Sequence, residues 1–170
     1  RLLNLDKTYN AIIKPAVDAC GIECIRADDI VHAGVIDKPM YDNLYSADLV
    51  IADLSTANPN AIYELGVRHA LRPNTTIVIA EDQFRFPFDL NSVVIRQYEH
   101  LGKGIDHDEA IRMRDSLVTT IRELMDNNGR NPDSPVYQFL PITSPAYKSG
   151  IDSSTQTIEA PTGNSDEKFS

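Results

Sequence analysis

The stretch DLVIADLSTANPNAIYELGVRHAL, residues 48–71, decides the fold. Its first part, residues 48–54, is a near-continuous apolar run of strand length, which is typical of a parallel strand buried on both faces. A polar loop and a predicted helix over about residues 59–72 follow. Asn58 is the predicted cap, and Pro59 suits the first helical position because no amide hydrogen is needed there. The apolar side of this helix is predicted to comprise Tyr63, Gly66, Val67 and Ala70.

The remaining sequence repeats this alternation of strand and helix. Strands are predicted over 22–27, 75–81 and 92–98, and helices over 6–20, 38–46 and 106–127. Asp6 is the predicted cap and Gly21 the predicted end of the first helix, which Pro15 should kink or split. Asp106 and Glu109 predict a capping box for the last helix. The pattern predicts an α/β fold with a flavodoxin-like, doubly wound parallel sheet, a three-layer αβα arrangement.

The two ends of the chain carry separate expectations. Doubly wound domains begin on a strand that becomes central, whereas this chain begins on a helix, so we expect a strand and its following loop to precede Arg1. Residues 1–127 are predicted to form the domain. Residues 128–170 are rich in Pro, Ser, Thr, Gly and Asn and are predicted to be a linker or disordered tail, although VYQFL, residues 136–140, could dock on the domain.

Composition narrows the class of protein. A chain of 170 residues with 42% hydrophobic and 24% charged residues fits one ordinary globular domain. Sixteen basic against 25 acidic residues give a net charge of −9, which argues against a long nucleic-acid polymer as partner but permits a small nucleotide. No apolar run approaches the roughly 20 residues of a membrane span, and the opening RLLNLDKTYN lacks a signal-peptide core. We therefore expect a cytoplasmic protein with no membrane partner.

The two cysteines, Cys20 and Cys24, form a C-x3-C pair. No second pair of metal ligands accompanies them, so we expect two small buried thiols in a reducing compartment and no metal site.

A candidate site lies beyond the strand 48–54, because ligands of open α/β sheets bind outside the carboxyl ends of the strands. Asp53 ends the strand, and Ser55 follows in the loop. Asn60 lies beside the free amides of the first helical turn, which favour an anion or another polar group. Glu64 is four residues further and shares the face of Asn60. A carboxylate there could attack or stabilise the anomeric carbon of a ribosyl group.

A simpler interpretation stands beside this one. Glu64 and Arg68 have the favourable i,i+4 order for a surface ion pair worth about 0.2–0.5 kcal/mol. Asn58 could be an ordinary cap, and Asp53 could bind only loop amides. The residues alone leave the two interpretations equal. Three polar residues after the strand 22–27 face either the same cleft or solvent: Asp28, Asp29 and His32.

The segment ADLVIADLSTANPNAIYELGVRHAL, residues 47–71, resembles the central motif of the nucleoside 2-deoxyribosyltransferase-like superfamily and of the related TIR-like nucleotide-binding domains. The likeness covers roughly residues 6–125. It implies that Glu64 is the nucleophilic glutamate and that Asp53 is the acidic or polar residue at the strand end. It further implies that Asn58 occupies the place of a phosphate-binding hydroxyl and Asn60 a place where relatives often have glycine.

The chain departs from this family at two places. Met40 stands where a general-acid aspartate is expected, and the glycine-rich loop of the family would precede Arg1. Cleavage of NAD depends less on a separate acid, because nicotinamide is already a cationic leaving group. The resemblance thus implies an N-glycosidase acting on NAD or a nucleotide, with no further cofactor, in which Glu64 and Asp53 are catalytic. The implied ligand-binding residues are Ser55, Asn58, Asn60 and Asp29. The alternative is a non-catalytic nucleotide-sensing or self-association module of a larger regulatory protein.

Overall fold

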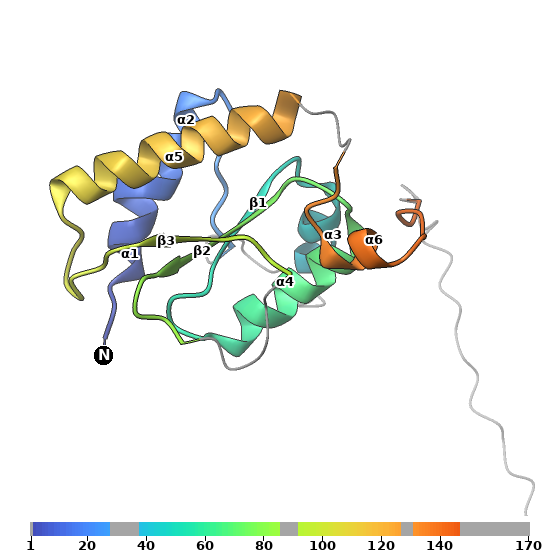
Figure 1. Ribbon diagram of the computed structural model, residues 1–170, viewed down its shortest axis with the longest axis horizontal. Coiled ribbons are helices and arrows are strands. Elements are labelled where there is room, and N and C mark those ends of the chain that lie inside the picture. The colour runs from blue at the N-terminus through green and yellow to red at the C-terminus, as the bar shows by residue number, and fades with distance from the viewer. Residues whose placement is uncertain (1, 28–37, 86–91, 127–130, 147–170) are drawn as a thin grey trace, which may run out of the picture.

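The computed structural model describes residues 2–27, 38–85, 92–126 and 131–146 (Figure 1). The chain forms a mixed α/β fold, and in the described residues its sheet has three parallel strands in the order β1-β2-β3. The elements in chain order are α1 (Leu5–Thr8), the π-helical η1 (Tyr9–Ile13), α2 (Lys14–Ala19), α3 (Lys38–Ser46), β1 (Val50–Asp53), α4 (Pro59–Leu71), β2 (Thr76–Glu81), β3 (Ile95–Tyr98), α5 (His107–Asp126) and α6 (Pro135–Phe139).

The central strand β2 separates two hydrophobic clusters. Every residue of β2 is buried, as its apolar sequence predicts. Ile77 and Ile79 join the cluster formed with η1, α2 and α5, whereas Val78 and Ala80 join the cluster formed with α4. Successive side chains of a strand point to opposite faces, so one strand serves both clusters. Figure 1 shows α5 with α1 and α2 on one face of the sheet and α4 on the other.

The first predicted helix is divided as Pro15 suggested. The π-helical turn of η1 ends one residue before α2 begins at Lys14, and Pro15 is the second residue of α2. Proline has no amide hydrogen, so the regular hydrogen-bond ladder is interrupted, and the interruption is accommodated as a π-turn. Gly21 has φ +71° and follows the end of the helix, as predicted, because glycine adopts this left-handed conformation readily.

The caps of two helices differ from prediction. The cap of α1 is Asn4 rather than Asp6: the Asn4 side-chain oxygen accepts from the Asp6 amide at 3.2 Å. At α5, the Asp106 carboxylate accepts from the Asp108 amide at 2.9 Å, as a cap should. Glu109 does not complete the capping box, because its carboxylate accepts from the Glu99 amide at 2.8 Å and from an arginine one turn later.

The predicted strand over 22–27 is wrong for this structure. Residues 22–26 carry no regular secondary structure and pair with none of the described strands. A β-strand exists only through hydrogen bonds to a neighbouring strand, so a favourable sequence is not sufficient. The two cysteines that flank the start of this segment are free and half-buried.

Residues 131–146 dock on the end of α4. Hydroxyl groups of Ser134, Tyr137 and Ser144 donate to the carbonyl oxygens of His69, Ala70 and Leu71 at 2.6, 2.8 and 2.7 Å. The last carbonyls of a helix have no partner within it, so these three contacts cap α4 from a distant part of the sequence. The segment VYQFL therefore docks on the domain, and residues 147–170 lie outside the described residues.

Two truncations should have different effects. Deletion of residues 147–170 should leave the melting temperature unchanged, because their composition offers few apolar anchors. Deletion of 131–170 should lower it by several degrees, since the α4 carbonyls lose hydrogen bonds worth about 1 kcal/mol each. Circular dichroism melting of the two truncated proteins checks this. Equal melting temperatures would show that the docking of 131–146 contributes nothing to stability.

The imidazole of His69 should make stability depend on pH. The residue is 7% exposed, and burial followed by the charge of Arg68 lowers the pKa of His69 from 6.5 to about 4. Below pH 6.5 the unfolded chain binds a proton that the folded chain does not, so stability is complete above pH 6.5 and falls as the pH approaches 4. His69→Gln should flatten this dependence in urea unfolding across that range. An unchanged pH profile in the variant would contradict the assignment.

Candidate functional site

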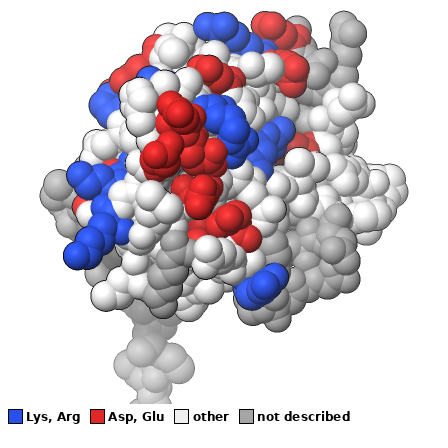
Figure 2. Space-filling view, turned by 60° about the vertical axis from the view of Figure 1, so that its left-hand side comes forward, with Lys and Arg blue, Asp and Glu red and all other residues white. Residues whose placement is uncertain are grey.

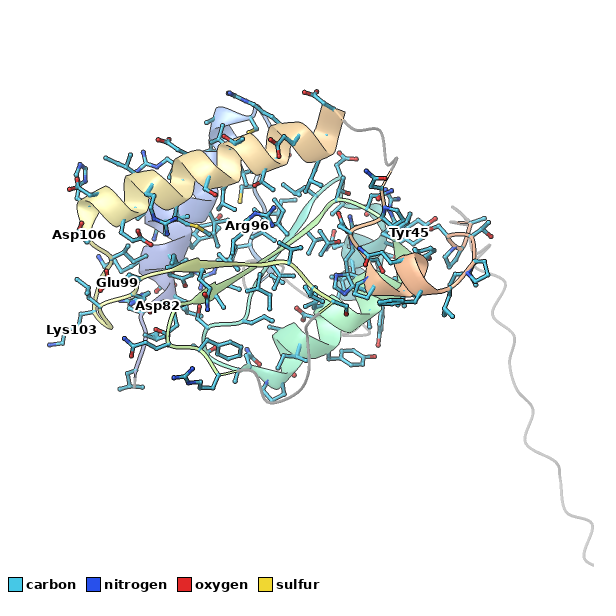
Figure 3. The ribbon with its side chains drawn as sticks, viewed as in Figure 1. Tyr45, Asp82, Arg96, Glu99, Lys103 and Asp106 are labelled. Atoms are coloured by element: carbon cyan, nitrogen blue, oxygen red, sulfur yellow. The ribbon has the colours of Figure 1, made fainter. Side chains whose placement is uncertain are left out.

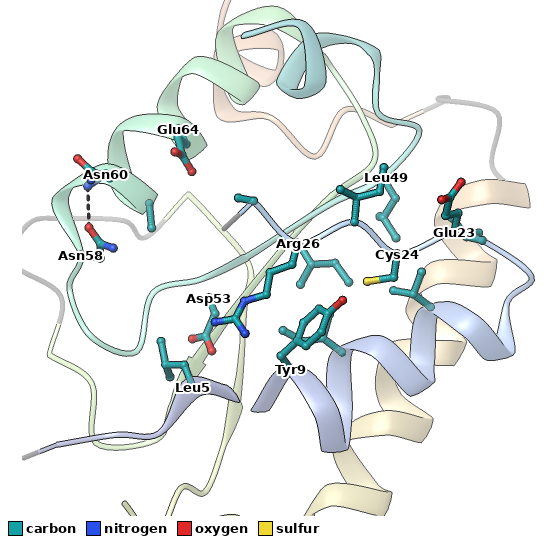
Figure 4. A pocket seen from close by; sticks show the side chains of 17 residues that line it. Leu5, Tyr9, Glu23, Cys24, Arg26, Leu49, Asp53, Asn58, Asn60 and Glu64 are labelled. Carbon is teal, nitrogen blue, oxygen red and sulfur yellow. Dashed lines mark hydrogen bonds between the residues drawn. The ribbon is translucent and has the colours of Figure 1, made fainter. Parts of the chain in front are cut away.

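A cavity of about 370 Å³ opens at the carboxyl end of β1 (Figure 4). Its walls come from α1, η1 and α2, from the segment 22–27, from β1 and from the first turns of α4. Four of the residues singled out in the sequence line it together: Asp53, Asn58, Asn60 and Glu64. The strand end and the helix start converge there because β1 runs into α4 through a short loop, whose Ala57 adopts the left-handed φ of +51°.

Glu64 and Arg26 are two of the charged residues that line this cavity, together with Glu23 and Asp53. Glu64 is half-buried on α4, and Figure 4 shows its carboxylate directed into the cavity. Arg26 extends from the opposite wall, with its Cζ 5.2 Å from the centre of the Tyr9 ring and its Nη1 2.6 Å from Asp6 Oδ1. Arg26 was not predicted as part of the site. A lone arginine at the end of an apolar run was the available signal.

The start of α4 keeps little free donor capacity. Asn58 is the cap, as predicted: its Oδ1 accepts from the Asn60 amide at 2.9 Å, and its carbonyl accepts from the Ile62 amide at 3.1 Å. Pro59 has no amide hydrogen. Within the described residues, the Ala61 amide is thus the remaining first-turn donor, and Ala61 lines the cavity. The predicted anion site is reduced to this amide and the side chains of the two asparagines.

Asp53 is held by a network of hydroxyl groups. Its Oδ1 accepts from both the amide and the hydroxyl of Ser55, and its Oδ2 accepts from the Tyr98 hydroxyl at 2.9 Å. The Tyr98 oxygen lies 3.0 Å from Thr8 Oγ1, and Ser55 Oγ accepts from the Glu81 amide at 2.7 Å. The network joins α1, β1, β2 and β3 at one edge of the sheet. Neither Tyr98 nor Thr8 was predicted as part of the site.

This network limits what Asp53 and Ser55 can do. Each carboxylate oxygen accepts about two hydrogen bonds, so Oδ1 is filled and Oδ2 has one acceptor direction left. Burial raises the pKa of Asp53 above its usual range, while the bonds from Ser55 and Tyr98 oppose that rise. Ser55 is 6% exposed and lies outside the cavity lining. Its hydroxyl holds Asp53 in place, so the structure does not bring Ser55 to the cavity with Asn58 and Asn60.

Met40, which stands where the resemblance places a general acid, lies on α3 and is not among the residues that line the cavity. Asp28, Asp29 and His32 lie outside the described residues.

The predicted ion pair between Glu64 and Arg68 is not formed. Arg68 is fully buried, and its guanidinium donates to the carbonyl oxygens of Leu44 and Ala47 at 2.7 and 2.9 Å. Its other bonds go to residues 74–76. The guanidinium thus serves the end of α3 and the turn before β2, while the carboxylate of Glu64 faces the cavity. An ion pair with Arg68 therefore does not explain the position of Glu64.

Surface and metal chemistry add few constraints. Figure 2 shows acidic side chains gathered at the centre of one face with basic side chains around them, and no continuous basic surface among the described residues on that face. The described residues contain no group of three or more His, Cys, Asp or Glu placed to hold a metal ion. No helix in the described ranges has the length and apolar character of a membrane span.

The structure therefore defines a mixed α/β domain with a cavity of ligand size at the carboxyl end of a parallel strand. Comparisons of the chain with protein-family models, with curated proteins and with solved structures found no match. The residues of the cavity are what a functional proposal rests on.

Proposed function

We propose that this chain is a flavodoxin-like, TIR-like or deoxyribosyltransferase-like domain that binds a nucleotide or nucleoside and cleaves its N-glycosidic bond. The observation that carries the proposal is the carboxylate of Glu64 directed into a cavity that Arg26, Asn58 and Asn60 also line. The volume of about 370 Å³ lies in the range of small-molecule sites.

Binding draws on four kinds of group. The planar guanidinium of Arg26 suits a phosphate, which it can bind through two parallel hydrogen bonds. The carboxamides of Asn58 and Asn60 are exposed at the mouth and offer both donors and acceptors. The free acceptor direction of Asp53 Oδ2 suits one ribose hydroxyl. The ring of Tyr9 gives the cavity an aromatic surface for a base.

Catalysis rests on Glu64. As the bond between the base nitrogen and the anomeric carbon breaks, its electron pair leaves with the base and positive charge develops on the sugar. The Glu64 carboxylate stabilises that charge or forms a glycosyl ester with the carbon, and water then completes hydrolysis. From NAD the leaving group is neutral nicotinamide, so no proton donor is needed at that step.

The proposal is tested by incubating the protein with NAD and with nucleoside monophosphates, following free base by chromatography and binding by calorimetry. Release of base from one of them supports the proposal. Binding without release identifies the non-catalytic nucleotide-sensing module instead. If the protein neither binds these compounds nor releases base from them, a nucleotide site is rejected, and self-association becomes the function to examine.

A further inference from the structure

The apolar half of the cavity is a groove between two extended stretches of chain. One side is residues 22–27, and the other is the edge of β1 that faces away from β2, represented by Leu49 and Ile51. Ile13 and Val17 of η1 and α2 line the same groove. The strand β1 is only half-buried along its whole length, whereas its neighbour β2 is buried throughout.

The backbone of β1 presents hydrogen-bonding groups to this groove. The amides of Val50 and Leu54 donate to β2 and the residue before it, at 3.0 Å each. Alternate residues of a strand direct their backbone groups to opposite edges, so the N–H and C=O of Ile51 point into the groove. Among the described residues, the segment 22–26 makes no ladder with β1. Backbone N–H and C=O groups that face an apolar groove cost free energy unless another backbone segment pairs with them.

We propose that this groove is the seat of a further strand, parallel to β1, formed by the polypeptide that leads directly into residues 2–4. In that position it pairs with β1 on one side and lets residues 22–27 pair on the other, as their sequence predicts. The occupant is an apolar strand, because both of its faces are covered: one by η1 and α2, the other by α4.

The position of residues 2–4 selects this occupant. The Asn4 amide donates to the Gly102 carbonyl at 2.9 Å, and His100 Nε2 donates to the Asn4 carbonyl at 3.1 Å, since His100 Nδ1 accepts from the Gly102 amide. His100 and Gly102 come just after the end of β3. Asn4, which is bonded to both, and the start of α1 therefore lie at the carboxyl edge of the sheet. A strand parallel to β1 ends at that same edge, and a short loop joins it to α1.

The handedness of the connections agrees. The chain passes from β1 to β2 over the face that carries α4. A strand in the groove would connect to residues 22–27 over the opposite face, through η1 and α2, and in the opposite direction along the sheet. The second crossover differs from the first in both the face of the sheet that it covers and the direction in which it moves along the sheet. Two such reversals leave the handedness of a crossover unchanged, so both connections satisfy the right-handed rule.

The proposed strand would also complete the cavity at the carboxyl end of β1, an inference that rests on the proposed function. Strand order would reverse between the new strand and β1, and ligands bind at such a reversal. The loop after the new strand would then close the cavity near Arg26 and Glu64, the polar end described above.

The seat is tested by adding a designed N-terminal extension to the full chain: about five valine and isoleucine residues and a short Gly-Ser connection. The matched control carries proline at the central position, which removes the amide that pairing needs. Hydrogen exchange of the Ile51 amide and alkylation of Cys24, in a Cys20→Ala background, report on the groove because Ile51 and Cys24 line it.

With the valine and isoleucine extension, the Ile51 amide should exchange on the order of 100-fold more slowly, Cys24 should react more slowly, and the melting temperature should rise. The proline control should show none of these changes. Equal behaviour of the two extensions would overturn the proposal. An Ile51 amide that is already protected without any extension would also overturn it. If that protection is lost on dilution, a second copy of the chain is the occupant. If it is lost on deletion of 147–170, the tail is the occupant. Base release is not measured here, so the seat and the proposed function fail separately.

Discussion

Replacing Glu64 by glutamine should abolish base release from NAD or a nucleotide while the fold stays intact. Glutamine keeps the size and polarity of the side chain but removes the charge that meets the anomeric carbon. Loss of a nucleophile in other enzymes lowers turnover by factors well above about 10³, and a drop of at least that size is expected. Glu64 is half-buried and belongs to neither hydrophobic cluster, so the unfolding midpoint should not fall. Chromatography of free base and urea unfolding measure the two quantities.

Glu23→Gln is the matched control for this prediction. Glu23 lines the same cavity but is exposed on the opposite wall. The substitution removes the same charge from the cavity at a distance from the asparagines, so activity should persist. If both glutamine variants lose activity equally, the cavity needs negative charge in general, and the assignment of Glu64 as the group at the anomeric carbon is wrong.

The alternation of strands and helices could be read from the sequence because it depends on local patterns. The apolar run TIVIAE is of strand length and predicts a buried strand. The strand β2 forms at Thr76–Glu81, within one residue of the prediction. The start of α4 was equally local, since Asn58 and Pro59 act on the amides of the next turn. Such features need no knowledge of the rest of the molecule.

The buried face of α4 could not be read in this way. The predicted apolar side includes Tyr63, which is 55% exposed, and Gly66, where an added Cβ would meet nothing within 4 Å. The structure buries Leu65, Arg68 and His69 instead. A periodicity argument counts arginine and histidine as surface residues, and it becomes correct only when their distant partners are known.

The polar contacts across the sheet were missed for a related reason. Tyr98 reaches Thr8 across 90 positions of sequence and Asp53 across 45. Two residues before Tyr98 in β3, Arg96 reaches α5, where it donates to Thr120 at 3.1 Å (Figure 3). A carboxylate at the end of a strand predicted that something polar would gather there, but the choice of tyrosine as donor depends on the register of β2 with β3.

The second large effect is expected at Arg68. Burial lowers its pKa to about 10, so the guanidinium remains charged at neutral pH, and it is held by carbonyl and hydroxyl oxygens of two separate segments. The first is the end of α3, where a helix lacks internal donors and where the Leu44 and Ala47 carbonyls accept. The second is the turn before β2, where Thr75 adopts the left-handed φ of +65°.

Arg68→Met should therefore destabilise the protein by about 3 kcal/mol or more, because methionine fills most of the volume but leaves these carbonyls buried without donors. For a domain of this size that corresponds to a melting temperature lower by roughly 10 °C. Arg68→Lys should recover little of it, since one ammonium group cannot reach both the end of α3 and the turn.

Arg72→Met is the matched control, one helical turn further along. Arg72 is half-buried, and its Cζ lies 5.6 Å from the centre of the Tyr45 ring, a contact worth about 0.5–1 kcal/mol at an exposed position. Thermal and urea unfolding of the three variants separate the effects. If Arg72→Met costs as much as Arg68→Met, loss of positive charge explains both results. If Arg68→Lys is as stable as the wild type, a point charge suffices, and the forked geometry of the guanidinium is not what holds α3, α4 and β2 together.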